Sequence, residues 1–175
     1  TYAEWVARWP RWNDRIATMG STASGRLAPR WRGRSVEVGD LMADLSSSAR
    51  QAEPLPAGEW VALLPGSKRA KLQVGVPFLL ETADRLAARR PGLRFLLPLA
   101  PTTSAPELLG FAGASNPIAR YFGCREPERR GNTLITAAGT EILLQEEHPA
   151  HGALSQCRLA LTTVGANTAE LGALG

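Results

Sequence analysis

The amino-acid sequence predicts an α/β fold in which helices cover both faces of a mostly parallel sheet. From residue 59 onward, short apolar runs alternate with longer segments of helical periodicity. Two of the apolar runs lead into a glycine-containing loop that opens a helix, at residues 65–69 and 163–168. Parallel strands need crossover connections, which are usually helices, so this alternation favours a parallel sheet.

The elements of this region follow the order β-α-β-α-β-β-α-β-α. Apolar runs bounded by turn residues predict strands at residues 60–64, 93–98, 132–137, 141–145 and 158–162. Helices are expected at residues 70–89, 105–111, 149–156 and 166–174. The first helix has the clearest period, because one face collects Leu72, Val76, Leu79, Leu80 and Ala83. The basic stretch at residues 115–131 is predicted to be irregular.

The start of the chain differs in composition from this α/β region. A helix interrupted at Pro10 is expected over residues 1–20, and a strand is expected at 35–38. Ser, Pro and Gly give residues 46–58 the composition of a linker. We therefore expect a remnant of a preceding domain at 1–45, the linker at 46–58 and the α/β domain at 59–175.

The first helical segment places tryptophans and arginines on neighbouring faces. One face carries Trp5, Trp9, Trp12 and Ile16, and the next carries Arg8, Arg11 and Arg15. Such a segment fits an interfacial helix on an anionic membrane, a stacking surface for single-stranded nucleic acid, or a helix that packs its tryptophans on a domain. We favour the third hypothesis, because Pro10 splits the segment.

Composition excludes several classes of protein. The chain has 175 residues, of which 44% are hydrophobic and 21% are charged, as in globular domains. It has no apolar run of 18 residues and no signal-peptide pattern at its start. Two cysteines are too few for a disulfide framework or a zinc site and fit a reducing cytoplasm. The net charge of +4 favours an anionic partner. Because the chain starts at Thr1 and stops inside a helical pattern, we expect a piece of a longer protein.

The first loop has the residue types of a phosphate site. Gly66 lets the chain turn and lets a ligand approach the backbone. Ser67 is a favourable N-cap and a hydroxyl donor, and Lys68 and Arg69 add positive charge. Free backbone N–H groups and the helix dipole point at the same spot. The alternative interpretation is an ordinary strand-to-helix turn with surface charges.

The second loop has the same design. Gly165 allows close approach, and Asn167 or Thr168 can cap the helix or donate a hydrogen bond. Glu170 lies one turn into the helix, where a carboxylate can accept both hydroxyls of a ribose, or where it merely complements the helix dipole. Because ligands bind at the carboxyl ends of parallel strands, two such loops on one sheet suit a diphosphate.

Four segments carry a resemblance to a known family. They are residues 61–69, 89–101 and 159–171, together with 38–44, which resembles the end of that family's first domain. In these segments the chain resembles lipid-A-disaccharide synthase, and the spacing from Gly165 to Glu170 is similar to the corresponding spacing in that family. The similarity covers roughly residues 20–175 and indicates a divergent, synthase-related branch.

The resemblance implies a two-domain GT-B glycosyltransferase, of which this chain would hold a Rossmann-like second domain, truncated, and part of the first. That second domain would bind the UDP of a UDP-sugar between the two loops, with the ribose on Glu170. The implied UDP-binding residues are Gly66, Ser67, Lys68, Arg69, Gly165, Ala166, Asn167, Thr168 and Glu170. Two positions depart from the family pattern, which has Arg at Lys68 and a small hydroxyl residue at Val164.

The resulting hypothesis is a glycosyltransferase fragment whose full enzyme moves a hexosamine from a UDP-sugar to a lipid or sugar acceptor. No catalytic base is assignable in this chain, and no cofactor or metal is expected; His148 and His151 are interpreted as part of a loop leading into a helix. The expected location is cytoplasmic, with peripheral contact at the inner face of a membrane as an option. A non-catalytic binding or scaffold relative is the alternative, and a nucleic-acid-binding module is a third hypothesis, although no nucleic-acid partner is expected.

Overall fold

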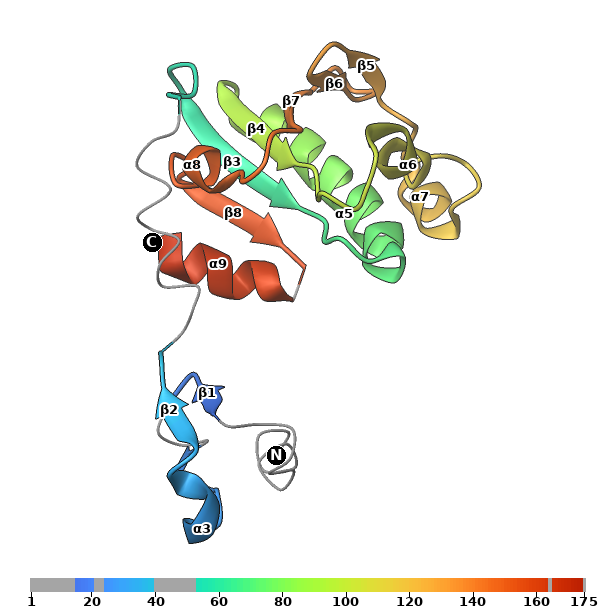
Figure 1. The fold of residues 1–175 in the computed structure, drawn as a ribbon. Helices are drawn as coiled ribbons and strands as arrows, with labels where there is room; N and C mark the ends of the chain where they lie inside the picture. The colour runs from blue at the N-terminus through green and yellow to red at the C-terminus, as the bar shows by residue number, and fades with distance from the viewer. Residues whose placement is uncertain (1–14, 21–23, 40–52, 164, 175) are drawn as a thin grey trace. The chain divides into compact units, whose positions relative to one another are not determined.

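The computed structural model describes residues 15–20, 24–39, 53–163 and 165–174 (Figure 1). The chain divides into two compact units, residues 1–45 and 46–175. The boundary falls at the start of the expected linker, and each unit is described by itself.

The described part of the first unit is a small parallel pair of strands with one short helix. Strand β1 (Ile16–Thr18) pairs with β2 (Ser35–Glu37), and α3 (Pro29–Arg32) lies between them in sequence. The expected strand at 35–38 is therefore present, but the helix expected over residues 1–20 is wrong at 16–18. Parallel pairing with β2 fixes these residues, and the Ile16 N–H donates a further hydrogen bond to the carbonyl of Arg34, just before β2, at 2.7 Å. Trp5, Trp9 and Trp12, with Arg8 and Arg11, lie outside the described residues.

The described part of the second unit contains a six-stranded sheet in the order β5-β6-β7-β4-β3-β8. The strands are β3 (Glu59–Leu64), β4 (Leu93–Pro98), β5 (Glu128–Arg130), β6 (Thr133–Ile135), β7 (Glu141–Gln145) and β8 (Leu159–Thr162). Strands β8, β3, β4 and β7 are parallel to one another, whereas β5 and β6 form an antiparallel hairpin at the edge. The predicted mostly parallel sheet is confirmed.

Helices cover both faces of this sheet, as predicted. They are α5 (Arg69–Arg89), α6 (Ala105–Gly110), α7 (Pro117–Phe122), α8 (His151–Leu154) and α9 (Ala166–Leu174). Figure 1 shows α5 on one face and α8 with α9 on the other. Alternate residues of β3 supply the two cores: Val61 and Leu63 pack towards α5, and Trp60, Ala62 and Leu64 towards α8 and α9.

Two short elements lie where the sequence predicted irregular structure. Helix α7 begins after Asn116, whose side chain accepts a hydrogen bond from the Ile118 N–H, and ends at Gly123 with φ of 69°. Strand β5 follows and turns back into β6 through Gly131. Neither element is long enough to show a hydrophobic period, so sequence periodicity could not reveal it.

The helix α5 packs unusually close to the end of β3. A Cβ placed on Gly75 would lie 2.6 Å from the Pro65 carbonyl oxygen and 3.0 Å from the Pro65 Cα. Both atoms belong to the backbone, so no side-chain rotation could relieve the overlap. Only glycine at position 75 allows the helix to hold the loop that starts at Pro65.

We therefore expect Gly75→Ala to lower the free energy of unfolding by about 1–3 kcal/mol, because the overlap outweighs the better helix propensity of alanine. Urea unfolding would measure the change. Gly110→Ala is the matched control, since it also lies in a helix and a Cβ there meets nothing within 4 Å. Equal unfolding free energies for the two variants would contradict this account of the α5 contact.

Candidate functional site

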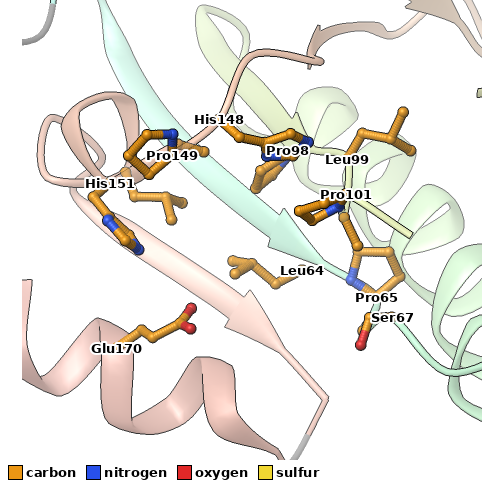
Figure 2. A pocket seen from close by; sticks show the side chains of 14 residues that line it. Leu64, Pro65, Ser67, Pro98, Leu99, Pro101, His148, Pro149, His151 and Glu170 are labelled. Atoms are coloured by element: carbon orange, nitrogen blue, oxygen red, sulfur yellow. The ribbon is translucent and has the colours of Figure 1, made fainter. Parts of the chain in front are cut away.

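One cleft of the second unit lies at the carboxyl ends of the parallel strands. It has a volume of about 530 Å³ and takes residues from the ends of β3 and β4, from the segment between β7 and α8, and from α9. Figure 2 shows these side chains converging from both sides of the β3 end. Ligands of open α/β sheets bind at this edge, because the strand-to-helix loops gather there.

The first loop forms one wall of the cleft. Gly66 and Ser67 line it, and Gly66 has φ of 100°, a conformation that favours glycine. The expected N-cap role of Ser67 is wrong: the N-cap of α5 is Lys68, and its side chain makes no capping hydrogen bond. The Ser67 hydroxyl is therefore not engaged in capping the helix that follows.

The two cations of this loop do not line the cleft. Lys68 is exposed. The Arg69 guanidinium lies over the Phe111 ring, 5.6 Å from its centroid, and lines a separate hollow with Glu107 and Asn116. The structure thus holds Arg69 in a cation–π contact that is not part of the cleft lining.

The second loop lies directly against the first. The Thr163 hydroxyl donates a hydrogen bond to the Pro65 carbonyl at 3.2 Å, and the Thr163 N–H donates to the Leu64 carbonyl at 3.2 Å. Lys71 of α5 also lies between them, since a Cβ on Gly165 would be 2.8 Å from its Nζ. Because β8 is the parallel neighbour of β3, both loops leave the sheet at the same edge.

Glu170 is the residue of the second segment that reaches the cleft. It lies on α9, is half-buried, and lines the cleft opposite the first loop. Figure 2 shows its carboxylate turned into the space between α9 and α8. Gly165 and Thr168 are exposed and do not line the cleft, and the side chains of Ala166 and Asn167 lie outside the described part of the structure.

The rest of the cleft lining was not predicted as part of a site. It consists of Leu64, Pro65, Pro98, Leu99, Ala100, Pro101, His148, Pro149, Ala150, His151 and Leu154. The Pro98–Pro101 run follows β4, and the His148–His151 segment follows β7, so both come from strand ends. That position in a parallel sheet is the signal that could have found them.

The lining is mainly apolar, with a few polar groups at its margin. Leucines and prolines form most of the surface, while Ser67, His148, His151 and Glu170 supply polar atoms. Such a cleft suits a ligand with a flat apolar part and several hydrogen-bonding groups. Within the described ranges, no group of three His, Cys, Asp or Glu side chains is placed to hold a metal ion.

The two cysteines lie outside this cleft and are free thiols. Burial raises the pKa of Cys157 to about 11. The pKa of Cys124 is also raised, first by burial and then by the carboxylates of Asp84 and Glu81. Both groups are therefore protonated at neutral pH and are poor nucleophiles.

No helix in the described segments is long and apolar enough to cross a membrane.

Comparison with known proteins points to one family. The chain is 30% identical to the lipid-A-disaccharide synthase of Pseudomonas fluorescens over 140 residues, which is 76% of this chain and 31% of that protein. The Myxococcus xanthus synthase is 36% identical over 85 residues, 47% of this chain and 22% of that protein. The Anaeromyxobacter dehalogenans synthase is 38% identical over 100 residues, 55% of this chain and 26% of that protein. No protein-family model matches the chain.

The fold is that of an α/β protein, and its cleft lies at the carboxyl edge of the parallel strands, where proteins of this class bind ligands. The comparisons make this chain a relative of the lipid-A-disaccharide synthases, a family of glycosyltransferases, as its motifs suggested. It spans less than a third of the length of these relatives.

The hydrogen bond between the two loops gives a first test of the site's construction. Thr163→Val keeps the side-chain shape but removes the donor to the Pro65 carbonyl, so we expect the free energy of unfolding to fall by about 0.5–1.5 kcal/mol. Chemical denaturation would measure it, with Thr102→Val in the exposed loop after β4 as the control. If both variants unfold like the wild type, the hydroxyl does not hold the loops together.

Proposed function

We propose that this chain carries the nucleotide-binding part of a glycosyltransferase. The full enzyme would transfer a hexosamine, with inversion, from a UDP-sugar to a hydroxyl of a lipid or sugar acceptor. The observation that supports this most directly is the cleft itself: Gly66 and Ser67 of the first loop and Glu170 of the second segment line the same space. The names of the similar proteins support the reaction class.

The backbone of the two loops suits a diphosphate. The first turns of α5 and α9 leave N–H groups without intrahelical acceptors, and their dipoles place positive potential at the carboxyl edge of the sheet. In glycosyl transfer the departing diphosphate gains negative charge, so the same groups would stabilise the leaving group. Gly66 allows the phosphates to approach the backbone, and Ser67 has a hydroxyl to donate.

The remaining parts of the nucleotide match other parts of the cleft. The apolar surface around Leu64, Pro98 and Pro149 suits a flat pyrimidine ring. The Glu170 carboxylate suits the ribose hydroxyls, which are donors. The reaction also needs a base that takes the proton of the acceptor hydroxyl, and none is assigned in this chain. This piece is accordingly proposed to bind UDP without turning over substrate.

The chemical nature of the acceptor would determine the cellular location at which the full enzyme acts. A lipid acceptor requires peripheral contact with a membrane, and a nucleotide-sugar donor places that contact on the cytoplasmic side. Trp5, Trp9 and Trp12, with Arg8 and Arg11, are one candidate for this contact, and they lie outside the described residues.

The second candidate function is a non-catalytic relative that keeps the sheet as a binding or scaffold domain. The specific observation in its favour is the position of the first loop's cations: Lys68 is exposed, and Arg69 lies over Phe111 instead of the cleft. In this alternative, Lys68 and Val164 mark the loss of a former phosphate site.

Titration of the isotope-labelled chain with UDP would test the nucleotide site. We expect amide shifts at Gly66, Ser67 and Glu170, which line the cleft, and at Gly165, whose loop is hydrogen-bonded to the first loop through Thr163. Gly139, in the hollow at the opposite edge of the sheet, is the internal control and should not move. Millimolar UDP without shifts at the four positions would exclude the proposed site.

Lys68→Arg separates a working site from a degenerate one. A guanidinium can bind two phosphate oxygens at once, so we expect the variant to bind UDP several-fold more tightly and uridine equally well. Calorimetric titration with both ligands would show the difference. An unchanged affinity for UDP would favour the non-catalytic alternative.

A further inference from the structure

His151 lines the cleft and has a buried ring nitrogen without a hydrogen-bond partner among the described residues. It is the first residue of α8, is half-buried, and lines the cleft. Its Nδ1 is enclosed by protein and has no hydrogen-bond partner among the described residues. A buried polar atom in this state is uncommon in folded proteins and calls for a physical account.

The enclosure of Nδ1 favours one tautomer of the imidazole. A neutral histidine carries its proton on one ring nitrogen, and the other nitrogen is an acceptor. A proton on Nδ1 would be a buried N–H without an acceptor, which costs more than a bare lone pair. The proton is therefore placed on Nε2, at the outer end of the ring, so His151 offers an N–H donor to the cleft.

An acceptor lies on the neighbouring helix. Glu170 projects from α9, and α8 packs against α9 through a shared core that includes Leu154 and Leu171. Figure 2 shows the His151 ring and the Glu170 carboxylate turned towards the same part of the cleft. The helices thus present a donor and an acceptor together at one wall, while the first loop forms the opposite wall.

A hydroxyl group is the ligand feature that matches this pair. A hydroxyl can accept a hydrogen bond from the imidazole N–H and donate its own proton to the carboxylate at the same time. A phosphate oxygen would satisfy the imidazole but would be repelled by Glu170. A carbonyl oxygen likewise has no proton to donate to the carboxylate.

We propose that His151 is a specificity-determining residue that, with Glu170, selects ribose over deoxyribose by binding the 2′-hydroxyl of a nucleoside diphosphate. The inference rests on the proposed nucleotide site and adds a residue and a sugar preference to it. His148 also lines the cleft, but it is exposed, so its ring is free to turn towards solvent.

Three substitutions at one position test this assignment. His151→Gln can place an N–H donor near the position of Nε2, whereas His151→Asn places one near Nδ1, and His151→Phe keeps the ring without a donor. The dissociation constants of UDP and 2′-deoxy-UDP would be measured by calorimetry for the 175-residue chain and each variant. Thermal unfolding would show that each variant is folded, and Glu147→Gln is the control, because Glu147 is exposed in the same segment and does not line the cleft.

We expect the wild type to bind UDP roughly three- to tenfold more tightly than 2′-deoxy-UDP, the range for loss of one hydrogen bond. His151→Phe and His151→Asn should remove this preference by weakening UDP binding alone, while His151→Gln and the control Glu147→Gln should retain it. A preference that survives in folded His151→Phe and His151→Asn would overturn the role of His151. Absence of UDP binding by the wild type would instead overturn the proposed function on which this role rests.

Discussion

The position of β3 in the centre of the parallel strands is the constraint on which the site depends. Its residues alternate between two buried cores, and its neighbours β4 and β8 are both parallel to it. A register shift of one residue would move every core side chain to the wrong face, so the end of β3 is firmly fixed. The loop that follows therefore leaves the sheet at a defined point, next to the ends of its neighbours.

Close packing then fixes the positions of the loops relative to the end of β3. Gly75 lets α5 approach the Pro65 backbone, and Thr163 joins the Pro65 carbonyl to the start of the second loop. The cleft is thus held from both sides of β3 by contacts that involve backbone atoms. Pre-organisation of this kind reduces the ordering cost of binding a ligand.

Local sequence signals predicted the parts of this architecture that depend on neighbouring residues. The apolar runs of β3 and β4, the period of α5 and the glycine loops all have such signals, and the structure has them in place. The helix expected at residues 16–18 was wrong, because these residues pair as a strand with residues 35–37, which are distant in the sequence. Glu170 was named from the sequence, but His151 was missed as part of the same wall, because packing between α8 and α9 brings the two together. The N-cap prediction for Ser67 was wrong for a different reason. Ser67 has favourable capping chemistry, but α5 starts one residue later than a Ser67 cap would require.

The contact between Arg69 and Phe111 has an energetic consequence for any ligand of the first loop. A cation–π contact at an exposed site stabilises the side chain by roughly 0.5–1 kcal/mol. A ligand that recruits this guanidinium must first break that contact, which lowers the apparent affinity of the ligand by roughly two- to fivefold. A dianion can offset that loss through a charge-assisted bidentate bond, whereas a weakly charged ligand cannot. The contact between Arg69 and Phe111 therefore gives a modest bias towards strongly anionic ligands in any binding that uses Arg69.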